Sequence, residues 1–176
     1  KLSVIIGYDH RQAKQWNLSS RRFAFLSALV FEHAGIDVTI LHGYNPTPLL
    51  PFSIMDTTTS SIGIMVTASH NPKQDAGYKV YWTDACQIRS PLDTKSTAFI
   101  QANLAPWIDY ETALSNLDES RFSDPKRTQE LAEAYFTALA TSGLKKKKVN
   151  VGTSANNNNN SSNSNSTPKF CYTALH

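Results

Sequence analysis

The sequence has few cysteines and no long apolar run, and both absences exclude whole classes of protein. Cys86 and Cys171 are the two cysteines among 176 residues. They are too few for a disulfide-rich secreted scaffold, and neither has the paired spacing of a zinc site. No run of about 18 apolar residues occurs, which argues against a membrane-spanning helix. The start also lacks the basic segment and apolar core of a secretory signal. We therefore expect a cytoplasmic protein without a membrane partner.

The sequence also has little excess charge once one lysine run is set aside. Lys and Arg number 17 against 14 Asp and Glu, a net charge of +3, and four lysines form the run Lys145–Lys148. The rest of the chain is therefore close to neutral, whereas a nucleic-acid-binding domain clusters positive charge on a folded surface. We expect no nucleic-acid partner. Nuclear targeting or RNA binding through the lysine run stays open as a minor alternative.

Strand and helix patterns alternate along most of the chain. Short β-branched runs predict strands at 3–7, 37–41, 62–67 and 78–82. Apolar residues at three- and four-residue steps predict helices at about 21–34 and 125–142, and two more helices are expected at about 47–56, opened by Thr47-Pro48, and 93–104. Such alternation is typical of a three-layer α/β/α domain. The loop before the fourth strand is too short for a parallel crossover, so we predict a mixed, mostly parallel sheet.

Composition divides the chain into three parts. We predict a folded domain over 1–148, a disordered Asn- and Ser-rich linker over 149–168, and the first strand of a further, truncated domain over 169–176. Because the first residue is Lys1 rather than Met, and His176 directly follows an apolar run, we expect a piece of a longer protein.

The segment Thr67-Ala68-Ser69-His70-Asn71-Pro72 carries the strongest indication of chemistry. It follows a predicted buried strand, and in open α/β sheets ligands bind beyond the carboxyl ends of the strands. The Ser69 hydroxyl could act as a nucleophile or phosphate carrier, and Lys79 could lie beside it if the next strand runs back antiparallel. The competing interpretation is an ordinary loop. Adjacent Ser and His form no catalytic dyad, and the Gly-x-Ser-x-Gly pattern of serine hydrolases is absent.

A second segment, Gly7-Tyr8-Asp9-His10-Arg11, leaves the first predicted strand. Arg11 could steady the Ser69 loop, or it could form an Arg–Asp pair that merely braces a turn. The residues themselves leave both interpretations open.

Residues 63–82 closely resemble the active-site segment of the α-D-phosphohexomutases, above all the branch that contains phosphopentomutase. The resemblance covers roughly residues 3–110 and resumes at Lys169–His176, which resemble the opening strand of the family's second domain. It also includes Ser19-Ser20-Arg21-Arg22-Phe23-Ala24, Thr47-Pro48, Cys86-Gln87-Ile88 and Asn103-Leu104-Ala105-Pro106-Trp107.

The resemblance implies an intramolecular phosphotransferase, a phosphosugar mutase. The serine that matches Ser69 would carry a phosphoryl group and exchange it with a sugar phosphate through a bisphosphate intermediate, with glucose 1,6-bisphosphate or a related sugar bisphosphate as activator. His70 would contact sugar or phosphate oxygens, and Lys79 would move a proton or contact phosphate. Arg11 would contribute to phosphate binding. Mg²⁺ would touch the phosphate on Ser69, with its other ligands outside this chain.

The sequence also departs from the family pattern. The aspartate-rich magnesium loop is absent, and Ala76 stands where the family pattern has a polar Asn. We therefore expect this piece alone to be an inactive monomer, although its parent converts sugar phosphates. Two alternatives remain, namely a sugar-1,6-bisphosphate synthase that uses the same Ser69 and a non-catalytic phosphosugar-binding remnant.

Overall fold

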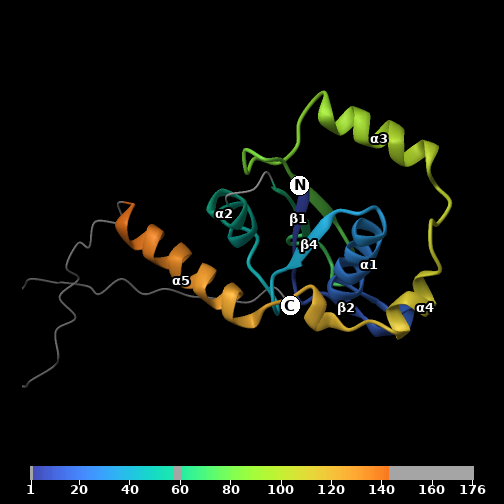
Figure 1. Ribbon diagram of the computed structural model, residues 1–176, viewed down its shortest axis with the longest axis horizontal. Coiled ribbons are helices and arrows are strands. Elements are labelled where there is room, and N and C mark those ends of the chain that lie inside the picture. The colour runs from blue at the N-terminus through green and yellow to red at the C-terminus, as the bar shows by residue number, and fades with distance from the viewer. Residues whose placement is uncertain (1, 58–60, 143–176) are drawn as a thin grey trace, which may run out of the picture.

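A computed structural model describes residues 2–57 and 61–142, which form a sheet between helices (Figure 1). The linker and second-domain predictions for 149–168 and 169–176 lie outside the described residues, as does the run Lys145–Lys148.

The central sheet has four strands in the order β4-β1-β5-β6. Their bounds are β1 Ser3–Tyr8, β4 Asp37–Ile40, β5 Ser61–Val66 and β6 Tyr78–Tyr81. β1 pairs in parallel with β4 and β5, and β6 pairs with β5 in the antiparallel sense. The predicted mixed, mostly parallel sheet is confirmed.

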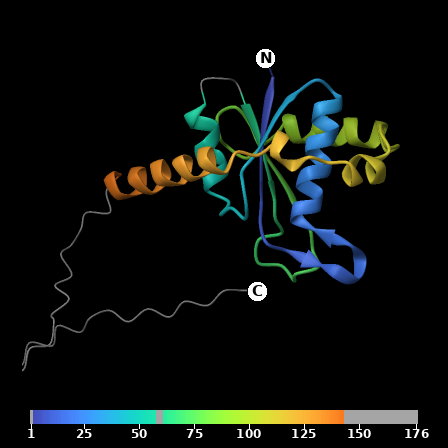
Figure 2. The same ribbon diagram turned by 60° about the horizontal axis from the view of Figure 1, so that its bottom comes forward.

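Helices cover both faces of this sheet. α1 (Ser20–His33) lies on one face, and α2 (Leu49–Asp56) with α5 (Pro125–Thr141) lies on the other (Figure 2). Because successive side chains of a strand point to opposite faces, Val4 and Ile6 pack in the core with α1, whereas Ile5 packs in the core with α2. The three-layer α/β/α prediction is confirmed.

Ser19 caps the N-terminus of α1. Its Oγ accepts a hydrogen bond from the Arg22 amide at 3.0 Å. We expect Ser19→Ala to lower the free energy of unfolding by about 1 kcal/mol, because a first-turn amide loses its acceptor. Ser19→Asp restores an acceptor and should retain most of the stability. Urea denaturation of the 176-residue chain measures both. Equal stability of the alanine and aspartate variants would contradict the assigned cap.

The sequence patterns missed several short elements. Where the sequence predicts neither helix nor strand, between residues 8 and 20, β2 (Gln12–Ala13) and β3 (Leu18–Ser19) pair as a small hairpin around the 3₁₀ turn Lys14–Trp16. The six-residue helix α4 (Tyr110–Ser115) was also unpredicted. Elements this short contain too few residues to show a hydrophobic period. The predicted helix at 93–104 is present as α3 (Leu92–Ala102), which has no buried residue and stands apart from the layers in Figure 1.

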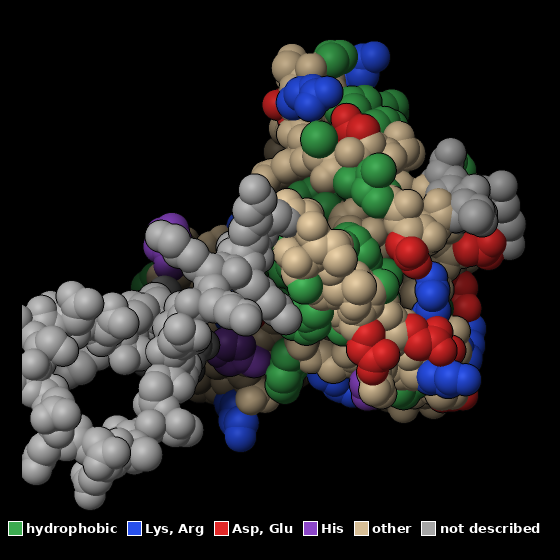
Figure 3. All heavy atoms as spheres, turned by 90° about the vertical axis from the view of Figure 1, so that its left-hand side faces the viewer, with side chains coloured by type: hydrophobic (Ala, Val, Ile, Leu, Met, Phe, Trp, Pro, Cys, Tyr) green, Lys and Arg blue, Asp and Glu red, His purple; other side chains and the backbone are tan. Residues whose placement is uncertain are grey.

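Surface charge is intermixed on the described residues. In Figure 3, Lys and Arg side chains lie beside Asp and Glu side chains on the face shown. The surface ion pairs include Arg21–Glu119, Arg22–Glu111, Arg121–Glu32 and Arg127–Asp56. Exposed pairs of this kind contribute little stability each. None of the helices in the described ranges has both the length and the apolar character needed to cross a bilayer.

Candidate active site

The loops that follow the neighbouring strands β1 and β5 leave the same end of the sheet in different directions. The chain that leaves β1 passes through the hairpin and α1 to β4, on one side of β1, while the chain that leaves β5 returns as β6 on the other side. Such a switch in direction opens a crevice at the carboxyl ends of the strands, where α/β proteins bind ligands. Figure 2 shows both loops at the end of the sheet opposite the N-terminus.

Ser69 and Lys79 meet in this crevice. Lys79 Nζ donates a hydrogen bond to Ser69 Oγ at 2.6 Å. The antiparallel register of β5 and β6 pairs Met65 with Lys79, and the Thr67 amide extends the ladder by donating to the Gly77 carbonyl at 3.0 Å. The side chain of Lys79 thereby reaches back to the loop that follows β5. Ser69 is exposed, so a ligand can approach its hydroxyl.

The loop holds Ser69 in a left-handed backbone conformation with φ of 57°. That region is unfavourable for a residue with a Cβ, and a residue stays there only when its surroundings hold it. The Ser69 amide donates to Thr67 Oγ1 at 3.0 Å, and the Asn71 amide donates to the Ala68 carbonyl at 3.1 Å. The hydroxyl is therefore presented by a constrained turn.

Arg11 holds the same loop from the β1 side. Its Nη1 donates to the Pro72 carbonyl at 2.7 Å, and its Nη2 donates to the Ser69 carbonyl. Its Nε donates to Asp9 Oδ2 at 3.1 Å, and the residue is only 4% exposed. The two interpretations that the sequence left open describe one arrangement, because Arg11 pairs with Asp9 and holds the Ser69 loop simultaneously.

Asp9 collects hydrogen bonds from several directions. Ser20 Oγ donates to its Oδ1 at 2.6 Å, the Arg11 amide donates to the same oxygen at 3.1 Å, and Thr67 contributes a side-chain hydrogen bond. Burial raises the pKa of Asp9, but these hydrogen bonds and the Arg11 charge together outweigh it and leave the pKa below its ordinary value of 3.8. The ionised carboxylate is thus the favoured form in the folded protein.

This depressed pKa predicts how Asp9 contributes to stability at low pH. A carboxylate with a lower pKa in the folded state stabilises the fold above its unfolded pKa, near 3.8, and loses that contribution as pH falls through the folded pKa. We expect Asp9→Asn to lower the free energy of unfolding at neutral pH and the difference from the original chain to shrink below pH 3.8. Urea titrations across this range measure it. A difference that grows on acidification would contradict the assignment.

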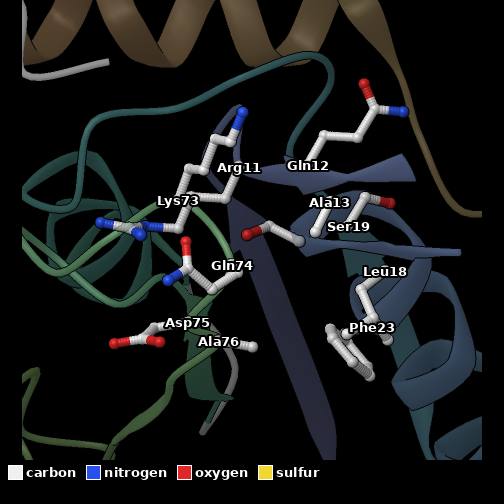
Figure 4. A pocket seen from close by; sticks show the side chains of 11 residues that line it. Arg11, Gln12, Ala13, Leu18, Ser19, Phe23, Lys73, Gln74, Asp75 and Ala76 are labelled. Atoms are coloured by element: carbon white, nitrogen blue, oxygen red, sulfur yellow. The ribbon is translucent and has the colours of Figure 1, made fainter. Parts of the chain in front are cut away.

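A small pocket separates the β2–β3 hairpin from the loop that follows the Ser69 turn. Figure 4 shows side chains from both segments around it, and Arg11 lies between them. Gln12, Ala13, Leu18 and Ser19 line it from the hairpin side, and Lys73, Gln74, Asp75 and Ala76 line it from the loop side. Ala76, the departure from the family pattern, therefore lies in the wall of this pocket.

His70 lies next to Ser69 and is exposed. Among residues 2–57 and 61–142, no group of three or more His, Cys, Asp or Glu side chains could hold a metal ion. The side chain that hydrogen-bonds to Ser69 Oγ is the cationic Lys79, whereas a hard cation such as Mg²⁺ prefers carboxylate and phosphate oxygens. The described residues alone therefore do not fit a magnesium site.

Sequence reasoning did not single out three residues that shape this crevice: Thr67, Ser20 and Gly77. Thr67 and Ser20 appear in the sequence only as members of longer segments that resemble the family. Gly77 is in contact with the backbone of Thr67, since a Cβ there would lie 2.3 Å from the Thr67 carbonyl oxygen. The glycine directly before a predicted strand was the available signal for such a close approach.

Comparison with known proteins places this geometry in a family. Residues 1–105 match the family described as "Phosphoglucomutase/phosphomannomutase, alpha/beta/alpha domain I". The chain belongs to that family. The match includes both loops of the crevice and ends before α4 and α5. The family's α/β/α domain description agrees with the three layers of the structure.

Relatives within the phosphoglucomutase/phosphomannomutase family carry related names. Human phosphopentomutase is 46% identical over 104 residues, and Saccharomyces cerevisiae phosphoribomutase is 43% identical over 109 residues. Human glucose 1,6-bisphosphate synthase is 39% identical over 103 residues. These alignments cover 58–60% of this chain and 16–17% of each relative, so the chain spans about a sixth of their length. The relatives support the phosphopentomutase branch that the sequence predicts.

Proposed function

We propose that this chain supplies the phosphoserine domain of a phosphosugar mutase, with Ser69 as the phosphoryl carrier. The contact of 2.6 Å between Lys79 Nζ and Ser69 Oγ carries the proposal. It sets an ammonium group against an exposed hydroxyl in the crevice of a phosphomutase-family domain. We extend domain I over residues 1–148, with sugar phosphates as its small-molecule partners.

The reaction consists of two phosphoryl transfers. The group on Ser69 passes to a free hydroxyl of a sugar monophosphate: a P–O bond forms to the sugar oxygen, and the P–O bond to Ser69 Oγ breaks. The sugar hydroxyl loses one proton and Ser69 Oγ takes one up, so the step balances. The resulting bisphosphate then returns its other phosphoryl group to Ser69. The net result is a sugar phosphate with its phosphoryl group on a different hydroxyl.

Lys79 is suited to act at the oxygen that changes partners. A phosphoserine carries about −1.5 to −2 charges at neutral pH, and charge spreads over the phosphoryl oxygens during transfer. An ammonium within hydrogen-bonding distance of Oγ can stabilise that charge and donate a proton to the departing serine oxygen. We propose that His70 contacts the sugar or phosphate oxygens from the exposed side of the loop. We assign no step to Mg²⁺, because the described residues do not form its site.

The direct test is phosphorylation of Ser69 in the intact protein that carries this chain. Incubation with glucose 1,6-bisphosphate, followed by proteolysis and mass spectrometry, should yield the Ser69 peptide with the mass of one added phosphoryl group. Ser69→Ala should abolish the modification, and Ser115→Ala, on the exposed helix α4, should leave it intact. An unmodified Ser69 peptide in active, folded protein would refute the proposal.

A second candidate is synthesis of a sugar bisphosphate, which the 39% identity to glucose 1,6-bisphosphate synthase favours. The same Ser69 would then receive its phosphoryl group from an acyl phosphate. Comparing 1,3-bisphosphoglycerate with glucose 1,6-bisphosphate as donor separates the two candidates. Faster labelling of Ser69 by the acyl phosphate would favour the synthase.

A further inference from the structure

Asp9 is the point at which three segments of the crevice meet. Asp9 itself follows β1, and its amide donates to the Val66 carbonyl at the end of β5 at 3.2 Å. Its side chain accepts hydrogen bonds from Arg11, from Ser20 in the first turn of α1, and from Thr67 after β5. None of these contacts involves the Ser69 hydroxyl, so Asp9 lies outside the group that touches the reacting atoms.

One route from Asp9 to Ser69 passes through Arg11. A guanidinium that is only 4% exposed needs a counter-ion and acceptors, because an unpaired buried charge is costly. Asp9 supplies the charge and accepts from Nε, which leaves Nη1 and Nη2 aimed at the Pro72 and Ser69 carbonyls. Without the carboxylate, the Arg11 guanidinium group is not held in one orientation, and its hydrogen bonds to the Ser69 loop weaken.

The other route passes through Thr67. Its hydroxyl bonds to Asp9 and also accepts the Ser69 amide proton at 3.0 Å. Thr67 is 4% exposed, so no solvent replaces a lost partner easily. Asp9 therefore orients the hydroxyl that holds the Ser69 N–H, while Arg11 holds the Ser69 carbonyl. The Asp9 carboxylate thus fixes the peptide groups on both sides of Ser69, through Arg11 and Thr67.

We infer that Asp9 is a positioning residue for Ser69, which it acts on through Arg11 and Thr67. The inference rests on the proposed function for its catalytic consequence, but the control of loop geometry is independent of any activity. The carboxylate keeps the serine backbone in its left-handed conformation, and so aims Oγ at Lys79 and at the exposed side of the crevice.

Asp9→Asn tests the inference with little change in shape. An amide NH₂ would face the Nε–H donor of Arg11, so one acceptor becomes a donor. In the 176-residue chain, we expect hydrogen exchange at the hydrogen-bonded amides of Ser69, Asn71 and Asp75 to accelerate by about tenfold or more, while amides of β5 serve as the reference for global unfolding. Asp84→Asn, at the exposed Asp84–Arg89 pair, is the matched control and should leave the loop unchanged.

Double-mutant cycles assign the routes. The effect of Asp9→Asn on loop exchange should shrink in an Arg11→Ala or a Thr67→Val background, because one of its two connections is already lost. Should Asp9→Asn fail to fold, Ser20→Ala removes a single donor to the carboxylate and should give a smaller acceleration of the same amides. Loop exchange equal to that of the unmodified chain, or an undiminished effect in both backgrounds, would overturn the inference.

Kinetics of the intact protein separate this inference from the proposed function. Impaired positioning of the nucleophile should lower kcat by about tenfold or more with little change in KM. If Ser69 takes up no phosphoryl group in the unmodified protein, the proposed function fails, and hydrogen exchange still decides the role of Asp9. If Ser69 is phosphorylated and Asp9→Asn alters neither exchange nor kcat, the inference alone fails.

Discussion

Ser69→Ala should reduce phosphosugar mutase turnover of the intact protein by at least about 10³-fold, because the substitution removes the nucleophile of the proposed reaction. The loop itself should survive. Arg11 and Thr67 hold the carbonyl and amide of residue 69, and neither contact uses the serine side chain. The expected loss is therefore chemical rather than structural. Conversion of glucose 1-phosphate to glucose 6-phosphate, with Mg²⁺ and glucose 1,6-bisphosphate present, measures it.

The control for this prediction is a serine that lies outside the crevice. Ser115 Oγ donates to the Glu111 carbonyl on the surface of α4, and Ser115→Ala should leave turnover within about twofold of the original. Unfolding curves of both variants should coincide with that of the unmodified protein. Turnover that survives in Ser69→Ala would remove the basis of the proposed function.

Gly77→Ala should destabilise the fold around the site more than Ser69→Ala does. A Cβ at this position would lie 2.3 Å from the Thr67 carbonyl oxygen and 3.1 Å from its carbonyl carbon, and the backbone cannot rotate away as a side chain could. Relief requires the end of the β5–β6 ladder to open, which displaces Thr67 and separates Lys79 from Ser69. We expect a loss of about 2–3 kcal/mol in the free energy of unfolding, measured by urea denaturation of the 176-residue chain.

Gly35→Ala is the matched control for this substitution. Gly35 has φ of +74°, and no atom lies within 4 Å of the position its Cβ would take. The cost there comes only from the left-handed backbone and should be about 1 kcal/mol. If both variants lost a comparable free energy of unfolding, the close contact at Gly77 would be relieved at no extra cost, which contradicts the structure.

The strands and principal helices were predictable because their signals are local. The β-branched run in Ser3–Tyr8, Ser19 before α1 and Gly35 after it each mark an element through neighbouring residues alone. The antiparallel return of β6 followed from the length of one loop, and that return places Lys79 against Ser69. Local pattern therefore predicted the pair at the centre of the candidate site.

The supporting contacts were not predictable in the same way. Asp9 acquires its importance from Ser20 and above all from Thr67, which is distant in sequence and approaches only after the sheet has formed. The tight contact between Gly77 and the Thr67 backbone depends on atomic distances, for which a single sequence contains no measure. Residues that position others through contacts across the fold show no characteristic spacing in the sequence. Residues that face each other on one hairpin do.

The antiparallel strand β6 has a consequence for how the site assembles. Ser69 and Lys79 are separated by ten residues, whereas Arg11 and Ser69 are separated by 58. Closing the short segment costs little chain entropy, and the long separation is bridged only by completing the parallel sheet. The ammonium and hydroxyl can thus associate early in folding, within a local unit of low contact order. The hydrogen bonds from Arg11 to the Ser69 loop form last, so the complete site geometry is reached only when the whole domain has folded.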